Sequence, residues 1–244
     1  LGDVYKRQEL KRHYNALARE GIAVEFVDQN ADLTGYGLVV VPMLYLLTDA
    51  FAKKLCAFAQ NGGTVIVTYW SGVVDESDLC RLGDTPYGLT ELLGLRRTEI
   101  DGMYDGETRR CMPAAGCTLP AAQASTLCEV AAFDEENPAE PLSLYDEDYF
   151  AGHPAVAVHR YGKGRAYYLA SRFDEAFYRA FYHDAAMEIG LIPAWPEALP
   201  EGVLAVRRGS FVFVQNCTEQ PATVGNTVLE RYRTAVWKGK DRIF

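Results

Sequence analysis

The segment from Gly62 to Gly72 most strongly constrains how this chain can fold. Its middle part, Thr64 to Thr68, is a run of five β-branched residues. Such side chains fit a pleated strand better than a helix, and the run lacks the alternation of a strand with one polar face. We therefore expect a central strand that is buried on both faces. Ligands in open α/β sheets bind beyond the carboxyl ends of strands, so Tyr69 to Asp78 is the first place to look for a site.

The segments around this strand alternate between helical and extended patterns. They predict helices at 9–20, 48–60 and 173–189, and strands at 22–27, 38–42, 95–101, 155–160 and 164–170. Thr48 suits the cap of its helix, and Gly21 and Gly190 are typical stop signals. Strands and helices that alternate with short links favour parallel pairing with right-handed crossovers. We expect an α/β fold: a flavodoxin-like, doubly wound sheet of the class I glutamine amidotransferase type.

The rest of the chain suggests a second, smaller domain. Pro193, Pro196 and Pro200 indicate a linker, and strands at 203–206, 210–216 and 223–229 predict a small all-β domain. The segment 103–150 is expected to be irregular, with short strands at 127–133 and 142–145. We expect His159 on a polar strand face, and weak later strands in the basic segment 231–244.

These patterns give three predicted parts. Residues 1–8 lack clear continuity with the helical pattern that begins at residue 9 and are assigned to a sequencing or cloning scar, the alternative being a native first helical turn. Residues 9–195 form the flavodoxin-like domain. Residues 196–244 form part of a C-terminal β-sandwich domain.

Charge and cysteine spacing exclude several function classes. A formal net charge of −9 over 244 residues argues against a nucleic-acid or anionic-membrane surface. No apolar run approaches the ~18 residues of a membrane span, and no leader is visible. None of the six cysteines forms a C-x-x-C pair, which argues against structural zinc. We expect a cytoplasmic protein with reduced thiols, in which Asn216 of the triplet Asn-Cys-Thr carries no glycan.

The strand end fails the tests for common catalytic and cofactor sites. Gly62 and Gly63 precede the strand, whereas nucleotide loops follow one. Ser71 lacks the G-x-S-x-G elbow of a nucleophile, and Cys80 lies too far along the chain. Asp75, Glu76 and Asp78 could bind a divalent cation, but a solvated helix start capped by Asp75 or Ser77 is favoured. We expect no cofactor and no metal.

Several motifs together resemble family 42 glycoside hydrolases, the β-galactosidases. The matching segments are 32–45, 62–79, 87–95, 99–101, 145–155 and 161–169, in order within residues 9–215. The resemblance implies an N-terminal (β/α)8 barrel with the chemistry, a flavodoxin-like middle domain that makes homotrimers, and a C-terminal β-domain. A barrel takes about 250 residues, so this chain is expected to hold only the last two parts.

A retaining glycosidase needs two carboxyl groups about 5–5.5 Å apart. Glu76, Glu99 and Asp101 are candidates, but nothing in their spacing places two of them across a sugar. We therefore expect a non-catalytic fragment of a retaining β-galactosidase, an enzyme that hydrolyses terminal non-reducing β-D-galactosides bound by its barrel. The fragment would serve trimer assembly. The alternatives are a free-standing amidotransferase-like domain that binds a small molecule, and an α/β module without activity.

Two groups of residues are candidates for contacts with another subunit. Aromatic residues are enriched in the cores of interfaces. Tyr104, Tyr145, Tyr149 and Phe150 could form such a surface or could cover the core of their own domain. The predicted subunit-interface residues, or edge of a neighbouring site, are Tyr69, Trp70, Asp75, Glu76, Tyr149 and Phe150.

Overall fold

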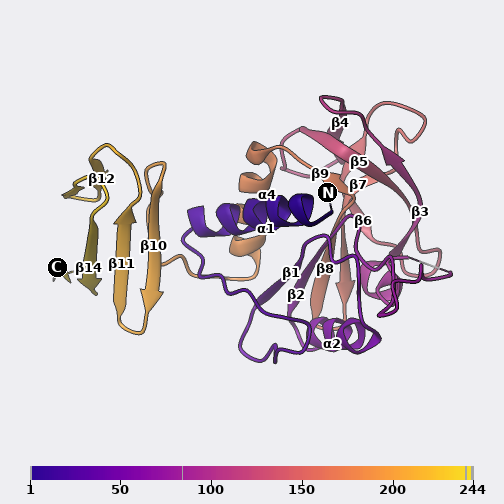
Figure 1. The fold of residues 1–244 in the computed structure, drawn as a ribbon, viewed down its shortest axis with the longest axis horizontal. Coiled ribbons are helices and arrows are strands. Elements are labelled where there is room, and N and C mark those ends of the chain that lie inside the picture. Colours follow the sequence, from indigo (N-terminus) through magenta and orange to yellow (C-terminus); the bar gives the residue numbers. More distant parts are fainter. Residues whose placement is uncertain (1, 84, 240, 243–244) are drawn as a thin grey trace. The chain divides into compact units, whose positions relative to one another are not determined.

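The computed structural model describes residues 2–83, 85–239 and 241–242, which divide into two compact units (Figure 1). Unit 1 comprises Leu1–Leu10 and Val27–Ala180, and unit 2 comprises Lys11–Phe26 and Phe181–Phe244. The division crosses two helices, α1 (Gly2–Arg19) and α4 (Glu175–Glu188). Helix α1 begins at Gly2, so residues 2–8, which the sequence did not connect to the rest, continue the helix predicted from residue 9.

Unit 1 is built on one large mixed sheet. In spatial order its described strands are β1 (Leu38–Val41), β2 (Thr64–Thr68), β8 (Gly164–Leu169), β7 (Pro154–Tyr161), β6 (Glu140–Tyr145), β4 (Thr108–Pro113), β5 (Ala122–Phe133) and β3 (Leu95–Gly102), while β9 (Ser171–Arg172) pairs with β5. The strand predicted from the β-branched run is β2. Its residues Val65, Ile66 and Val67 are fully buried between β1 and β8, as expected.

Among the strands that the structure describes, β1, β2 and β8 pair in parallel. The other pairs among the described strands of the large sheet are antiparallel. One of them is the predicted hairpin of β7 and β8, which turns the chain back at Gly162 and Lys163. The expectation of a doubly wound parallel sheet is therefore wrong beyond these three strands. Antiparallel neighbours can be joined by short turns, so this part of the sheet needs no crossover helices.

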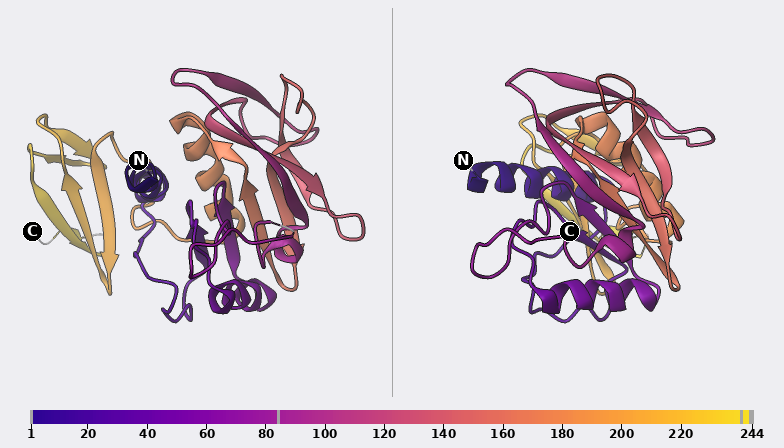
Figure 2. Two further views of the ribbon diagram at one scale, coloured as in Figure 1. Left: turned by 45° about the vertical axis from the view of Figure 1, so that its right-hand side comes forward. Right: turned by 90° about the vertical axis from the view of Figure 1, so that its right-hand side faces the viewer.

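The segment 103–150 holds more strand than the irregular insert that we expected, and the two short strands predicted at 127–133 and 142–145 lie within β5 and β6. It forms β4, the 12-residue β5 and β6. Its prolines hid this pattern: Pro113 ends β4, and Pro141 lies at a register shift of β6, one of the few places where a strand tolerates proline. β4 and the first part of β5 form a ribbon that extends past the parallel strands (Figure 2).

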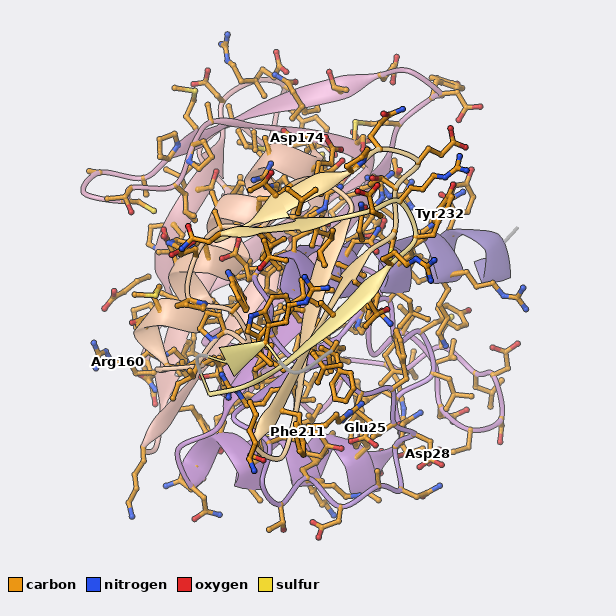
Figure 3. All side chains as sticks on the ribbon, turned by 90° about the vertical axis from the view of Figure 1, so that its left-hand side faces the viewer. Glu25, Asp28, Arg160, Asp174, Phe211 and Tyr232 are labelled. Carbon is orange, nitrogen blue, oxygen red and sulfur yellow. The ribbon has the colours of Figure 1, made fainter. Side chains whose placement is uncertain are left out.

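Helix α2 (Asp49–Gln60) begins where the sequence predicts, and α4 begins two residues after the predicted start at residue 173. Thr48 caps α2 by accepting a hydrogen bond from the Phe51 amide, and α2 packs against β2 and β8. Asp174 caps α4 by accepting from the Phe177 amide, and it is labelled in Figure 3. The short helix α3 (Thr90–Leu93) covers His159, whose Nδ1 lies 2.9 Å from the Leu92 carbonyl oxygen. His159 is therefore buried, and its prediction as a polar-face residue is wrong.

Unit 2 contains a four-stranded antiparallel sheet and a hairpin. The sheet consists of β10 (Val203–Arg208), β11 (Phe211–Asn216), β14 (Thr234–Lys238) and β15 (Asp241–Arg242), and the hairpin of β12 (Ala222–Val224) and β13 (Thr227–Leu229). Residues 223–229 are thus a hairpin and not one strand, because Gly225 adopts φ 55° and turns the chain. The segment 231–244 also supplies more than expected, since Trp237 of β14 is buried in the core and its ring contacts Trp195.

The predicted strand Ile22–Val27 is absent. These residues have no strand partner within the part of the chain that the structure describes, and the Phe26 ring is 62% exposed and stacks on Tyr14. A strand needs a ladder partner as well as an apolar pattern. No helix among the described residues is long and apolar enough to cross a membrane.

Candidate interaction site at the ends of the parallel strands

The carboxyl ends of β1 and β2 adopt a strained backbone. Met43 has φ 45° and Trp70 has φ 57°, in the left-handed region that residues with a side chain seldom adopt. Hydrogen bonds hold this geometry: the Met43 amide donates to Thr68 Oγ1 at 2.8 Å, and the Leu44 amide donates to Ser71 Oγ at 3.0 Å. Such strain costs about 1–3 kcal/mol per residue and clusters at functional sites. The strand end predicted from the sequence is therefore the strained end of the sheet.

Two aromatic rings lie at this end, and two leucines of the loop after β2 are exposed. The rings of Tyr45 and Trp70 lie with centroids 6.5 Å apart and planes 30° apart. Burial raises the pKa of the Tyr45 hydroxyl and the Asp78 carboxylate adds to this effect, which places the loop after β2 beside the Tyr45 ring. In this loop Leu79 is 65% exposed and Leu82 is 92% exposed. We call the side chains of Tyr45, Trp70, Leu79 and Leu82 the strand-end shelf.

Backbone hydrogen bonds join the segments that carry the shelf. The Tyr45 carbonyl oxygen accepts from the amides of Val73 and Val74, at 2.9 and 3.2 Å. The Arg81 amide in turn donates to the Val73 carbonyl oxygen at 2.9 Å, and the Asp75 amide donates to that of Leu79 at 3.0 Å. The shelf therefore rests on three adjacent segments.

The acidic residues of the loop form a turn and not the start of a helix. Asp75 Oδ1 accepts from the amides of Leu79 and Ser77, and these hydrogen bonds lower the pKa of the Asp75 carboxyl group. Asp78 adopts φ 61°, which ends any helical course. Glu76 lies 3.6 Å from Arg81, which also pairs with Asp49 at 2.7 Å. Within the described residues, no group of three or more His, Cys, Asp or Glu side chains is placed to hold a metal ion.

A buried carboxylate group holds the backbone of Trp70 in place. Glu129 on β5 is fully buried and accepts hydrogen bonds from the Trp70 amide at 2.9 Å and from Arg97 Nη1 at 2.7 Å. The Tyr168 hydroxyl also donates to it. Burial raises the pKa of Glu129, an effect that these three donors oppose. The network ties β3, β5 and β8 to the strained residue at the end of β2.

Tyr69 belongs to a second buried network, also within unit 1. Burial raises the pKa of its hydroxyl, and the charge of Glu9 adds to this effect. Glu9 Oε1 pairs with Arg172 Nε at 2.5 Å, and Glu9 Oε2 accepts from the Tyr178 hydroxyl at 3.4 Å. The Arg172 guanidinium lies over the Tyr5 ring, 5.4 Å from its centroid. Tyr69 is therefore a core residue, and it does not face a partner as predicted.

The other predicted contact residues divide between core and surface. Tyr145 and Phe150 are buried, because they pack against each other with ring centroids 5.0 Å apart. Phe150 thus cannot contact a partner as predicted. Tyr149 and Tyr104 are 62% and 84% exposed. The Tyr149 hydroxyl donates to Glu99 at 2.6 Å, and this bond raises the pKa of Tyr149 to about 12.

Sequence reasoning missed Tyr45, Arg97 and Glu129. The pairing of Tyr45 with Trp70 depends on the parallel contact of β1 and β2. Glu129 did leave a signal, since it is a lone acid in the apolar run Leu127–Phe133. A buried acid of that kind needs a cation or several donors, which Arg97, Tyr168 and Trp70 supply. The site thus combines rigid support with a half-buried Trp70 and the exposed side chains of Tyr45, Leu79 and Leu82, an arrangement that suits binding.

Comparisons with known proteins agree with this architecture. Residues 2–192 match the family described as the β-galactosidase trimerisation domain. The chain is 41% identical over 228 residues to β-galactosidase BglY of Alicyclobacillus acidocaldarius. The aligned region covers 91% of this chain and 33% of that protein. It is 33% identical over 221 residues to β-galactosidase Pbg of Clostridium perfringens, covering 88% of this chain and 32% of the relative.

A solved structure shows the same fold. The crystal structure of the β-galactosidase from a Rahnella species superimposes with a TM-score of 0.87 at 37% identity, over 93% of this chain and 36% of that one. The chain thus spans about a third of the length of these relatives. With the family match extending from residue 2 to residue 192, the chain belongs to the trimerisation-domain family of the family 42 β-galactosidases.

Proposed function

We propose that this chain is the assembly part of a retaining β-galactosidase and that it contributes no catalytic carboxyl group. The match of residues 2–192 to the trimerisation-domain family carries this proposal. In the parent protein, a barrel outside this chain would bind terminal non-reducing β-D-galactosides and hydrolyse them. The proposal also takes the assembly to be a homotrimer and the protein to be cytoplasmic.

The positions of the candidate acids support a non-catalytic role. Catalysis with retention needs two carboxyl groups about 5–5.5 Å apart across one sugar. Glu76 belongs to the loop after β2 and lies near Arg81, whereas Glu99 and Asp101 belong to β3. Glu99 already accepts a hydrogen bond from Tyr149. Glu76 and Glu99 thus already have partners, Arg81 and Tyr149, and Glu76 lies on a different element from Glu99 and Asp101.

The proposal extends to the domain boundaries and to the contact residues. Residues 9–195 would form the trimerisation domain, with β1, β2 and β8 as its flavodoxin-like part, and residues 196–244 would form part of a C-terminal β-sandwich. Of the predicted contact residues, Trp70, Asp75, Glu76 and Tyr149 would face a neighbouring subunit. Their location at the surface or at the strained strand end supports this role.

Two measurements test the proposal. Light scattering after size-exclusion chromatography should give three times the 27.1 kDa mass of the chain at high concentration. A strictly monomeric chain would contradict the assembly role. The chain should also cleave a chromogenic β-galactoside no faster than a heat-denatured sample, and faster cleavage would contradict the absence of catalytic groups.

A further inference from the structure

We infer that Asn61 is a site of spontaneous deamidation and that opening of the end of α2 controls the rate of this modification. The inference concerns a covalent change in the chain itself and does not depend on the proposed assembly function. It rests on the residue that follows Asn61, on the backbone conformation of Asn61 and on the packing of the turn after it.

The sequence singles out Asn61 among the asparagines. Of the six asparagines, only Asn61 is followed by glycine. Because Gly62 has no Cβ, nothing shields its backbone nitrogen from the Asn61 side chain. Both residues are exposed, so water reaches them. Asn226 is also exposed, but the β-branched Thr227 follows it and crowds the corresponding nitrogen.

The reaction needs only the chain and water. The Gly62 nitrogen forms a bond to Asn61 Cγ, and the bond between Cγ and Nδ2 breaks. Nδ2 leaves as ammonia together with the proton of the Gly62 amide, and a cyclic succinimide remains. Water then adds to either carbonyl carbon of the ring. Opening at Cγ gives aspartate, whereas opening at the main-chain carbonyl gives isoaspartate, in which the main chain runs through Cγ.

The folded conformation holds the two reacting atoms apart. Asn61 has ψ 3°, at which the Gly62 nitrogen eclipses the nitrogen of Asn61 and is turned away from its Cβ. The Gly62 amide donates to the Ala59 carbonyl oxygen at 3.0 Å, and Asn61 Nδ2 donates to that of Ala57 at 2.9 Å. Ring closure needs rotation about the Cα–C bond of Asn61, which breaks the hydrogen bond to Ala59. The reaction therefore proceeds from a state in which the last turn of α2 is open, and helix ends fray.

The products would disturb a tightly packed turn. The Lys163 amide in the β7–β8 hairpin donates to the Gln60 carbonyl oxygen at 3.1 Å, and a Cβ on Gly164 would overlap the Gly63 carbonyl oxygen. Isoaspartate lengthens the main chain by one carbon atom where this packing leaves no room. Aspartate places a negative charge at the C-terminal end of α2, where the helix dipole disfavours it. Deamidation should therefore weaken the contact of α2 with the start of β2 and with the hairpin.

Ageing of the whole chain measures the rate. The folded chain, and the same chain unfolded in guanidinium chloride, are held at one mildly alkaline pH, and their digests are followed by mass spectrometry. In the unfolded chain the peptide with Asn61 should gain the mass of deamidation much faster than the peptide with Asn226. In the folded chain the Asn61 rate should be about 10- to 100-fold lower than in the unfolded chain, since opening breaks two hydrogen bonds.

The dependence on denaturant identifies the state that reacts. At concentrations of guanidinium chloride that leave the chain folded, the Asn61 rate should stay nearly constant, because local opening exposes little surface. Reaction through global unfolding would instead follow the steep denaturant dependence of the whole chain.

Two variants separate the site from the effect of its product. Asn61→Gln keeps a neutral amide but would have to close a larger ring, so the mass gain of this peptide should disappear. Asn61→Asp carries the charge of one product, and it should melt about 1–4 °C below Asn61→Gln. Circular dichroism would confirm that both variants are folded.

Four outcomes would overturn the inference. Equal rates at Asn61 and Asn226 in the unfolded chain would exclude the effect of Gly62, and equal rates in the folded and unfolded chains would exclude control by α2. A rate that follows global unfolding, or no reaction in the folded chain, would place the chemistry in the unfolded chain. Equal melting temperatures of Asn61→Asp and Asn61→Gln would contradict the effect on the turn. The proposed assembly function stands in every case.

Discussion

The pair of Glu129 and Arg97 allows the sharpest test of how unit 1 is stabilised. Both side chains are buried, at 0% and 7% exposure, and their charged atoms lie 2.7 Å apart. Glu129→Gln removes the negative charge and leaves the Arg97 guanidinium buried without its counter-charge. Arg97→Met removes the positive charge and leaves the Glu129 carboxylate buried. Breaking a buried pair from one side costs about 3–5 kcal/mol in the free energy of unfolding.

The double variant should be much more stable than the sum of the single changes implies. With both charges gone, no isolated charge remains in the core, and a buried pair replaced by apolar groups is often nearly neutral. We expect each single variant to lower the melting temperature by roughly 6–20 °C, at about 2–4 °C per kcal/mol for a chain of this size. The double variant should recover most of that loss. Urea unfolding followed by circular dichroism would measure all three free energies.

An exposed ion pair serves as the control. Arg110 and Asp146 are 2.6 Å apart, but their side chains are 55% and 40% exposed. Asp146→Asn should therefore cost less than about 1 kcal/mol, because water screens the pair. Single variants of the buried pair that unfold as easily as this control, or costs that simply add in the double variant, would refute the reasoning.

Three further predictions concern single residues. Burial lowers the pKa of His13 to about 3, and the charge of Arg12 adds to the effect. Below pH about 6.5 the unfolded chain therefore binds a proton on His13 that the folded chain does not bind. Stability should therefore fall by about 1.4 kcal/mol per pH unit between pH about 6.5 and pH about 3, and His13→Gln should flatten the slope in urea titrations; an unchanged slope would exclude His13 as its source. Thr48→Ala should cost about 1 kcal/mol through loss of the cap on the Phe51 amide, whereas Thr48→Ser should keep nearly full stability. Asn216→Ala should cost about 1–3 kcal/mol, because the Asn216 amide donates to the carbonyl oxygens of Gln220 at 2.7 Å and Leu229 at 3.1 Å, and an unchanged melting temperature would contradict this.

The sequence predicted the elements of unit 1 that carry a local signal. The β-branched run gave β2, the Thr48 cap gave the start of α2, and the turn at Gly162 gave the hairpin of β7 and β8. Each of these signals lies in consecutive residues, and the physical preference acts within the element itself.

The sequence failed where pairing or burial depended on distant residues. The segment Ile22–Val27 has a strand pattern but finds no ladder partner in the described structure, whereas β5 has partners on both sides and stays extended despite its modest pattern. Tyr69 and Phe150 read as surface aromatics because nothing nearby in the sequence shows what covers them. In Figure 3 the labelled Arg160, at the end of β7, projects outward, although its neighbour His159 is buried under α3.

The sequence by itself determined the central strand, its flanking helix and the family resemblance, because β-branched runs, caps and motif order are properties of neighbouring residues. Only the tertiary structure decided what the end of that strand is. Parallel pairing of β1 with β2 brings Tyr45 beside Trp70, and β5 carries Glu129 to the Trp70 amide from 59 residues away. The strand end that first suggested catalysis is thus a rigid, partly apolar shelf, because Thr68 and Ser71 are buried in its support while Tyr45, Leu79 and Leu82 are exposed.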